Sequence, residues 1–571
     1  MLWKMRAFSA VVGASLLSSI AGYWASPGRS WDLKVKSRSS RFNRQRQRLE
    51  STEGNDASGP GIDTMKRLTE LRSFNSIVID KVIEAVDDVI FDSWKHNSES
   101  VPHSGVKERV VILGSGWGAH AFVSSLDASR YDATVISPRN YFLFTPMLAG
   151  AAVGTVEYRS ITQPIRDANP QVDYLEATCK DVDVEKKEVA CEIVVCQGTS
   201  CEIKDFNVPY DHLIIGVGAS TNTFGIPGVR EHCNFLKQIE DAAQLRNGIG
   251  NCFERANIPG LTDLQKQETL TFAVIGAGPT GVEFVAELCD FIEQDVPEVY
   301  PQLLPFVRVK LIEASNKVLM AFDGELQEKA IETLQARCVS GAGNVGLVEV
   351  LLKAGVKEVT SDSVILTDDT RIRYGLSVWA AGNGPVPLVL DLTKRIEEQN
   401  ALQGMARGRL VVDSWLRVKG VNDGSMWSLG DCAFVEGASY PATAQVAAQQ
   451  GSFLARIFSR NYNLAAPAPP RILEGGDKVG IAQTLAGLDK DVGGYAKGFQ
   501  FLNLGILAYL GDSKALAQIQ VADATIKGSG ITGFALWRSV YLSKQVSWRN
   551  RLLVAIDWAK SRTFGRDLTR L

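Results

Sequence analysis

The sequence predicts an α/β protein with two Rossmann-like dinucleotide-binding domains and a C-terminal membrane-associating region. Two glycine motifs carry this prediction, GSGWGA at Gly114–Ala119 and GAGPTG at Gly276–Gly281, about 160 residues apart. Each follows a short run rich in β-branched residues, VVIL or FAVI, which is typical of a strand, a glycine turn and a helix. The length of 571 residues and the 45% hydrophobic content are sufficient for several cores. Two nucleotide folds in series favour electron transfer between two bound nucleotides.

The N-terminal end predicts a targeting segment over residues 1–50, followed by an extension over residues 51–105. The first segment holds ten Lys or Arg and a single acid, Asp32, before Glu50. This composition favours a mitochondrial transit peptide over a plastid one, or over a secretory or anchoring segment built on the apolar stretch Ala7–Trp24. A disordered basic tail is the remaining alternative. Helical periodicity over residues 65–94 predicts a docked helix in the extension.

Charge and cysteine content limit the class of protein. The net charge of −3 provides no general attraction for nucleic acid, so no nucleic-acid partner is expected. Nine cysteines occur without a CxxC pair, and we expect them to be reduced and mostly structural. Only five histidines are present, none of them at ligand spacing, so no metal site is expected. The electron carriers are therefore expected to be organic cofactors.

The first dinucleotide domain is predicted to begin at residues 106–235, with a βαβ unit, a strand hairpin and the buried strand of YDHLIIGVGAS. Its glycines allow a tight turn and close approach to a pyrophosphate. Ser137 stands at the next strand end, where an acid often binds the ribose, and Arg139 follows it. On this ground the dinucleotide stays ambiguous. The cofactor-binding residues expected from the motif itself are Gly114, Ser115, Gly116, Trp117, Gly118 and Ala119.

The second dinucleotide domain is predicted over residues 236–378. All three motif glycines, Gly276, Gly278 and Gly281, are present, with Pro279 and Thr280 between them. The strand VRVKLI is followed by Glu313, whose carboxylate could accept both ribose hydroxyls and repel a 2′-phosphate. This favours NADH over NADPH, although Glu313 could also be an ordinary strand end.

Two later segments, RYGLSVWAAGNGP and SMWSLGDCA, are predicted as strands that return the chain to the first domain, over residues 379–462. In the second segment, Gly430 and Asp431 form a turn whose carboxylate could accept a ribityl hydroxyl of a flavin. No cysteine pair follows the first glycine motif, where flavin disulfide reductases carry a dithiol. Together these features predict FAD in the first domain, a nicotinamide nucleotide in the second, and a diffusible electron acceptor.

A Pro/Ala-rich linker leads into the C-terminal region, residues 463–571. The apolar run over residues 499–511 has 13 residues, too few to span a bilayer, and is expected to be a membrane-contacting loop. Residues 548–570 carry six basic and two acidic side chains, which favours an interfacial membrane helix. Packing on the body or a homodimer seam is the alternative. The apolar stripe of this helix is Trp548, Leu552, Ala555, Ile556 and Ala559.

From Arg109 onward the chain resembles the type II, non-pumping NADH:quinone oxidoreductases. The matching segments include SPRNYFLFTPML, GASTNTFGIPGV, GAGPTGVEFVAEL, LGDCA, TAQVAAQQG and LGILAYLG, in that order. The resemblance implies FAD and NADH as cofactors, a membrane quinone such as ubiquinone as acceptor, and a peripheral place on the mitochondrial inner membrane, with a plastid membrane as alternative. It further implies that Gln445 and Gln449 face the quinone and that Glu283 lies near the flavin. Other cofactor contacts expected on this basis are Thr145, Ala219, Ala381, Gly382, Ala444 and Gln445.

Two rival functions are weaker. A sulfide:quinone oxidoreductase would need cysteines beside the flavin and no nicotinamide site, and only Cys179 and Cys432 keep this alternative open. An apoptosis-factor-like binding protein would need basic patches on the folded body, whereas the basic residues gather at the termini. The calcium-binding DxDxDG loop of some relatives is absent, so calcium control is not expected.

Overall fold

The computed structural model describes residues 107–197, 200–338, 346–459, 462–465, 471–472, 496–521, 524–567 and 569. The targeting segment and the extension predicted over residues 1–50 and 51–105, with the helix at 65–94, lie outside the described residues.

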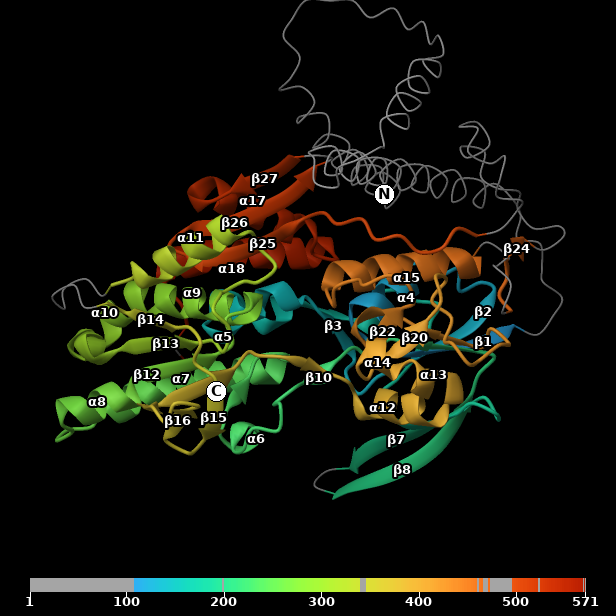
Figure 1. Cartoon of the computed structure of the whole chain (residues 1–571), viewed down its shortest axis with the longest axis horizontal. Helices are drawn as coiled ribbons and strands as arrows, with labels where there is room; N and C mark the ends of the chain where they lie inside the picture. The colour runs from blue at the N-terminus through green and yellow to red at the C-terminus, as the bar shows by residue number, and fades with distance from the viewer. Residues whose placement is uncertain are drawn as a thin grey trace, which may run out of the picture. The chain divides into compact units, whose positions relative to one another are not determined.

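A five-stranded parallel sheet forms the centre of the first dinucleotide fold (Figure 1). Its strands, in spatial order, are β21 (Met426–Ser428), β9 (His212–Ile215), β1 (Glu108–Leu113), β2 (Tyr131–Ile136) and β5 (Asp173–Leu175). Helices α4 (Trp117–Ser125) and α15 (Ala444–Ser459) pack together beside it. The last four residues of β1 are fully buried, as a strand covered on both faces requires.

A second five-stranded parallel sheet forms the other fold. Its strands, in spatial order, are β11 (Asn234–Phe235), β18 (Leu376–Trp379), β12 (Thr271–Ile275), β13 (Arg308–Ile312) and β14 (Val348–Leu351), and its principal helices are α7 (Ile239–Ala256), α9 (Pro279–Gln294) and α11 (Gly324–Gln335). The prediction that RYGLSVWAAGNGP returns the chain to the first domain is wrong, because its strand β18 pairs with β12. Only β21, from SMWSLGDCA, joins the first sheet. Both segments are buried strands before glycines, so the sequence pattern did not distinguish their sheets.

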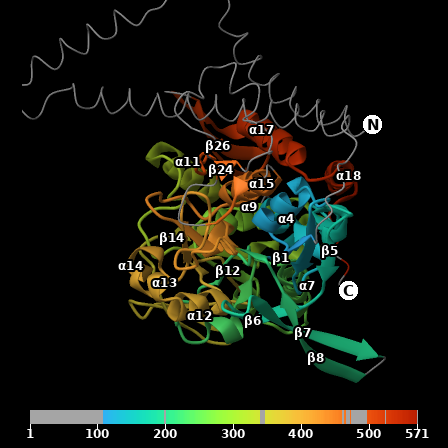
Figure 2. The ribbon, with the colours of Figure 1, turned by 90° about the vertical axis from the view of Figure 1, so that its right-hand side faces the viewer.

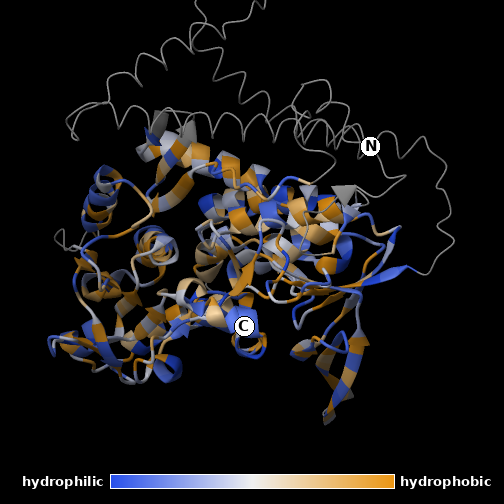
Figure 3. Cartoon of the chain, turned by 45° about the vertical axis from the view of Figure 1, so that its right-hand side comes forward, coloured by the Kyte–Doolittle hydropathy of each residue, from blue (hydrophilic) through white to orange (hydrophobic). Residues whose placement is uncertain are grey.

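The predicted hairpin is present as a three-stranded antiparallel sheet of β6 (Thr178–Asp183), β7 (Glu188–Gln197) and β8 (Ser200–Pro209). Strands β7 and β8 extend away from the body (Figure 2) and mix hydrophobic with hydrophilic residues (Figure 3). The expectation that all cysteines are reduced is wrong, because Cys196 and Cys201 form a disulfide. The hairpin register places these two residues directly opposite each other, so their spacing of five was the signal of a cross-strand pair.

Smaller elements connect these sheets or extend their edges. They are β3 (Tyr141–Leu143), α5 (Leu148–Ala152), β4 (Thr162–Pro164), β10 (Ser220–Thr221), α6 (Val229–His232), α8 (Asp263–Thr269), α10 (Val296–Val299), β15 (Val356–Val359), β16 (Ser363–Leu366), β17 (Arg371–Arg373), β19 (Asn383–Gly384), α12 (Pro387–Arg395), α13 (Glu397–Ala401), α14 (Gln403–Ala406), β20 (Leu410–Val412), β22 (Ala433–Val435), β23 (Tyr462–Asn463) and β24 (Arg471–Ile472), with short 3₁₀ turns at Thr145–Met147, Tyr158–Ser160, Ile165–Asp167, Pro301–Phe306 and Gly430–Cys432.

The C-terminal region forms an antiparallel sheet and two helices against α9 and α11 (Figure 1). The elements are β25 (Ile506–Gly511), β26 (Lys514–Val521), β27 (Ala524–Gly528), α17 (Gly530–Ser543) and α18 (Trp548–Phe564). The expectation of a membrane-contacting loop over residues 499–511 is wrong for its second half, which is strand β25. Ala508 and Leu510 are buried in the core shared with α9, so they are not available to a membrane.

The last helix has two unlike faces. Val554 and Trp558 are buried against the body, whereas Trp548, Leu552 and Ile556 are half or more exposed. The exposed residues follow the predicted stripe at steps of four, which keeps them on one side of the helix. Among the described residues no helix combines the length and the apolar character needed to cross a bilayer.

Candidate active site

A single large cavity of about 1030 Å³ is lined by residues of both glycine motifs. It lies at the carboxyl ends of β1 and β12, where open α/β sheets bind their ligands. The predicted site residues that line it are Gly114, Ser115, Gly116, Trp117, Gly118, Ser137, Arg139, Thr145, Ala219, Pro279, Thr280, Glu283, Ala381, Gly382, Gly430, Asp431 and Ala444. The predicted residues that do not line it are Ala119, Gly276, Gly278, Gly281, Glu313, Gln445 and Gln449.

The first glycine motif forms a cradle suited to a pyrophosphate. Gly114 has a φ of +104°, and a Cβ there would lie 2.5 Å from the carbonyl oxygen of Gly216. At Gly116 a Cβ would meet no atom within 4 Å, so the backbone faces open space. Helix α4 starts at this point without a side-chain cap and without an acid in its first turn. Its terminal N–H groups and dipole therefore suit the phosphates of FAD.

Two glycines allow α15 to pack closely on α4. A Cβ on Gly451 would lie 2.2 Å from the carbonyl oxygen of Gly118, and one on Gly118 would collide with Leu429. The close crossing brings Ala444 and Ala447, in the first turns of α15, to the cavity wall.

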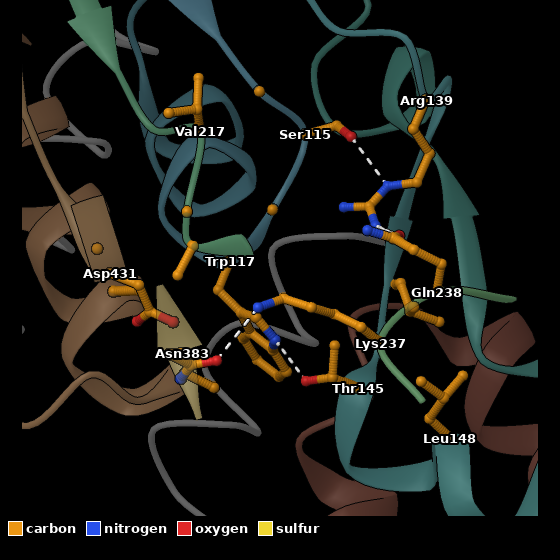
Figure 4. Close-up of a pocket in the computed structure, with 18 of the residues that line it drawn as sticks. Ser115, Trp117, Arg139, Thr145, Leu148, Val217, Lys237, Gln238, Asn383 and Asp431 are labelled. Atoms are coloured by element: carbon orange, nitrogen blue, oxygen red, sulfur yellow. Dashed lines mark hydrogen bonds between the residues drawn. The ribbon is translucent and has the colours of Figure 1, made fainter. Parts of the chain in front are cut away.

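One side of the cavity is fixed by hydrogen bonds around Arg139 (Figure 4). The guanidinium donates from Nε to the carbonyl oxygen of Tyr141 at 3.1 Å and from a terminal nitrogen to Oε1 of Gln238 at 2.5 Å. The hydroxyl of Ser137 donates to the Ser115 hydroxyl at 3.2 Å. Burial lowers the pKa of Arg139 from its usual range. A positive charge held in this way fits an anionic dinucleotide.

Lys237 and Asn383 face the cavity opposite Thr145 (Figure 4), and the sequence analysis missed both. Lys237 Nζ donates to Oδ1 of Asn383 at 3.2 Å, and burial lowers the Lys237 pKa, an effect that Asp431 opposes. Burial likewise raises the pKa of Asp431, against the effects of Lys237 and Arg409. Lys237 comes shortly after β11 and Asn383 begins β19, elements far apart in sequence, so no local motif marked these two residues.

Gln450 is a further missed residue, and it fixes the turn that carries Asp431. Its side chain is buried, and its Oε1 accepts a hydrogen bond from the backbone N–H of Gly430 at 2.7 Å. The residue follows the pair Gln445 and Gln449 in TAQVAAQQG, which was the available signal.

The second glycine motif has the same turn geometry as the first. Gly276 has a φ of +104°, and a Cβ on Gly281 would lie 1.9 Å from the Gly276 carbonyl oxygen. Glu313 follows β13 as predicted, and its two oxygens accept from the backbone N–H groups of Ala277 and Ser315, each at 2.8 Å. These bonds fix the carboxylate beside the glycine turn.

Glu283 lies on α9 one turn after the second glycine motif and reaches the cavity wall. Its Oε1 accepts a hydrogen bond from the backbone N–H of Tyr509 at 3.3 Å. Burial raises the pKa of Glu283 to about 8. The carboxyl is therefore mainly protonated at neutral pH and can donate a hydrogen bond or a proton.

Gln445 and Gln449 clamp the segment over residues 502–505. Gln445 Nε2 donates to the carbonyl oxygen of Gly505 at 2.8 Å, and Gln449 both donates to and accepts from the backbone of Leu502 at 2.9 Å. The clamped segment leads directly to Leu507, which lines the cavity together with Tyr541. The two glutamines thus hold the segment that precedes one lining residue, Leu507.

The cavity offers few thiol groups for chemistry at the flavin. Among the described residues that line the cavity, Cys179 is the single cysteine. Cys432 is buried, and its thiol donates to the backbone carbonyl oxygens of Leu429 and Ile215.

Comparisons with known proteins agree with this arrangement. The family described as pyridine nucleotide-disulphide oxidoreductase matches residues 108–451, and the NDH2 C-terminal domain matches residues 503–567. A probable NADH dehydrogenase of Dictyostelium discoideum is 39% identical over 467 residues, covering 81% of this chain and 91% of that protein. An external alternative NADH-ubiquinone oxidoreductase, mitochondrial, of Yarrowia lipolytica is 36% identical, covering 83% of each.

A solved structure of NDH2 from Plasmodium falciparum in complex with NADH is also similar. It shares 26% sequence identity with a TM-score of 0.69 and covers 81% of this chain and all of that one. The two family matches, the high coverage of both relatives and the cavity shared by two dinucleotide folds lead to one assignment. The chain belongs to the type II, or alternative, NADH:quinone oxidoreductases, a group of FAD- and NADH-binding flavoproteins.

Proposed function

We propose that this chain oxidises NADH and reduces a membrane quinone without pumping protons. The names of its relatives favour ubiquinone as that quinone. The observation that carries the proposal is the single cavity that both glycine motifs and the start of α15 line together. FAD held there would supply the chemistry that takes a hydride from NADH and delivers two electrons to the quinone. With one cysteine at the cavity, the sulfide:quinone alternative lacks the thiols it needs.

The two nucleotides are assigned to different motifs. The α4 cradle at Gly116, together with Arg139 and Asp431, would hold FAD. Pro279 and Thr280 at the start of α9 would position NADH, with Glu313 beside them for the adenosine ribose. Protein groups would bind and orient both rings.

We assign the quinone to the end of the cavity lined by Ala444, Ala447, Leu507 and Tyr541. This wall is mainly apolar, as a quinone ring requires. Gln445 and Gln449 complete the quinone site by holding residues 502–505 in place, and their uncharged amides introduce no charge there.

Steady-state NADH oxidation with a short-chain quinone tests this site. We expect Gln445→Ala and Gln449→Ala each to raise the quinone KM by about tenfold, the effect of about 1.4 kcal/mol of lost binding. The KM for NADH should stay near its wild-type value. Gln403→Ala, in α14 and away from the cavity, is the control. If Gln445→Ala and Gln449→Ala both had the quinone KM of wild type, the two glutamines would not contribute to the quinone site.

The apolar face of α18 is proposed to bind the surface of the mitochondrial inner membrane, since several relatives are named as mitochondrial ubiquinone oxidoreductases. Trp548, Leu552, Ile556 and Phe564 are all at least half exposed on this helix. Ile531, at the start of α17, adds a fifth exposed side chain. Together with the basic residues of α18, this face has the character of an interfacial helix.

Vesicle co-sedimentation tests the membrane proposal. We expect Leu552→Glu with Ile556→Glu to abolish binding to anionic vesicles and leave the NADH affinity unchanged. Glu325→Gln, on the exposed first turn of α11, is the control. If the wild-type protein is a homodimer in analytical ultracentrifugation, and the double variant is monomeric but still binds vesicles, the stripe is a dimer seam.

A further inference from the structure

Two of the three buried carboxyls of helix α9 reach one small cavity, and the third, Asp290, is paired with Arg337. Glu283 and Glu287 are four residues apart, 8% and 6% exposed, and both reach a small internal cavity. Glu283 also lines the large active-site cavity, so its carboxyl lies at the boundary between the two spaces. A carboxyl pair at this spacing occupies adjacent turns of one helix face.

The internal cavity has room for about one water molecule, with about 10 Å³ for the centre of a water-sized sphere. Its lining includes the indole of Trp537, which is 5% exposed; the indole Nε1 completes no hydrogen bond of good geometry among the described residues, although it lies close enough to Glu283 to oppose the rise of that carboxyl's pKa. A water there can accept from this N–H and bridge the carboxyls of Glu283 and Glu287, which satisfies all three groups.

On its other side Glu287 is connected toward the surface. The Thr155 hydroxyl donates to Glu287 Oε2 at 2.6 Å and accepts from Arg566 Nε at 3.0 Å. Thr155 also lines an outer cavity formed with Asp557, Lys560 and Asp567, and Lys560 is exposed. The active-site cavity and the internal cavity thus share Glu283, and the internal and outer cavities share Thr155, which is hydrogen-bonded to Glu287.

The proposed reaction takes up one proton for each quinone reduced. NADH supplies two electrons and one proton as a hydride, whereas a quinol carries two electrons and two protons. One proton per turnover, in the sum NADH + H⁺ + quinone → NAD⁺ + quinol, therefore comes from water. The active-site cavity is closed toward this side by Glu283.

We propose that Glu287 is the second member of a proton relay that takes a proton from the outer cavity through Thr155 and hands it to Glu283 for quinone reduction. This inference rests on the proposed function. Glu287 touches neither cofactor nor quinone, and acts through Glu283.

The charges around the pair suit this role. Burial raises the pKa of Glu283 to about 8 and that of Glu287 to about 7, so both can gain and lose a proton near neutral pH. Arg566 and Arg538 oppose the shift at Glu287, and Asp290 reinforces it. At Glu283 the Tyr509 N–H opposes the shift, while Glu287 adds to it. Two tyrosines also face the pair, Tyr541 beside Glu283 and Tyr509 beside Glu287.

Rapid mixing of the FAD-loaded enzyme separates the two half-reactions. In Glu287→Gln and Thr155→Val we expect quinone reduction to slow about tenfold or more, with a larger solvent isotope effect. Bleaching of the bound flavin by NADH should stay within about twofold of wild type, since hydride transfer needs no relay. Glu287→Asp and a small weak acid such as formic acid should each restore part of the rate.

Infrared titration provides a readout that is independent of turnover. In wild type, the infrared C=O band of the protonated buried carboxyls should change as the pH passes through neutrality. In Glu287→Gln one component of that change should be missing. Glu293→Gln, on the same helix but paired with Arg337 outside these cavities, is the matched control for both measurements.

The relay would be overturned if Glu287→Gln slowed both half-reactions equally. It would also be overturned if this variant reduced quinone at the wild-type rate and its infrared titration were unchanged. If Glu287→Gln does not fold, Thr155→Val decides in the same way. Failure of the wild-type enzyme to reduce any quinone would instead refute the proposed function, while the infrared titration would still report on Glu287.

Discussion

At the residue scale, the second dinucleotide fold contains two glutamates with opposite environments. Glu313 follows a strand and accepts two backbone N–H bonds beside the glycine turn. Glu283 lies inside a helix, where burial raises its pKa to about 8 and one long backbone bond only partly compensates. The same side chain is therefore suited to ribose recognition at one position and to proton exchange at the other.

Glu313→Gln should weaken discrimination against NADPH. The neutral amide no longer repels a 2′-phosphate and can donate to it, so the ratio of kcat/KM values for NADH and NADPH should fall by about tenfold, or about 1.4 kcal/mol. Steady-state kinetics with both nucleotides measure this ratio. Lys310→Gln, on the same strand but paired with exposed Glu349, should leave it unchanged. An unaltered ratio in Glu313→Gln would contradict the ribose role.

The raised pKa of Glu283 also predicts a pH dependence of stability. The folded state holds this proton more firmly than the unfolded chain, so the contribution to stability is fully present below pH 4.5 and is lost as the pH rises toward 8. Between pH 6 and pH 8 the free energy of unfolding should fall by about 1 to 2 kcal/mol more in wild type than in Glu283→Gln. Urea titrations at both pH values measure the difference, and parallel curves would show that Glu283 is not protonated in the folded state.

At the scale of elements, the crossing of α4 and α15 joins the FAD cradle to the quinone wall. The first helix begins at the glycine turn, and the second begins at Ala444 and carries Gln445 and Gln449. Their separation is set by Gly118 and Gly451, which leave no room for a methyl group. One contact therefore sets the geometry of two binding regions.

Gly451→Ala should push these helices apart. The added Cβ would lie 2.2 Å from the Gly118 carbonyl oxygen, so we expect a loss of about 1 to 3 kcal/mol and a lower content of bound flavin. Thermal unfolding and the flavin absorbance per protein measure the two effects. Gly404→Ala, also helical but with no atom within 4 Å of the new Cβ, should be neutral or slightly stabilising. Equal stability of both variants would refute the close crossing.

At the scale of the whole molecule, α9 connects the second dinucleotide fold to the C-terminal region. Asp290 of α9 accepts from Arg337 at 2.6 Å, from the Tyr509 hydroxyl at 2.5 Å and from the Asp512 N–H at 2.8 Å. Asp295 accepts from Arg566 at 2.6 Å with both side chains nearly buried. The C-terminal sheet and tail are thus fixed to α9 by charged hydrogen bonds that water cannot readily replace.

Arg337→Met should destabilise the protein by about 3 kcal/mol or more, because it leaves the buried Asp290 carboxylate without its cation. Chemical denaturation measures the loss, and proteolysis should cut first within the C-terminal region. Lys310→Met removes a pair whose partner Glu349 is exposed, and should cost less than about 1 kcal/mol. Similar losses in the two variants would show that the Arg337 pair is not specially buried.

Local motifs were enough for much of the fold and part of the site. Both glycine turns, the strand before Glu313, the hairpin and the last helix follow from patterns within about 20 residues, and the structure contains all of them. Lys237 and Asn383 could not be identified in this way, because the bond between them joins residues 146 positions apart. The misassigned strand β18 has the same cause, since strand pairing is not a local property. The Cys196–Cys201 disulfide is local, and its spacing of five was a signal that the sequence analysis did not use.

The sequence by itself determined that two dinucleotide folds follow one another, because glycine turns between a buried strand and a helix are dictated by local sterics and by helix N-termini. It also indicated the stripe of α18, because helical periodicity needs no partner. The tertiary structure alone decided that residues 506–511 form a buried strand on α9 instead of a membrane loop, since an apolar run is suited to either environment. It also decided that Glu283 and Glu287 share a cavity, because burial is a property of the whole fold.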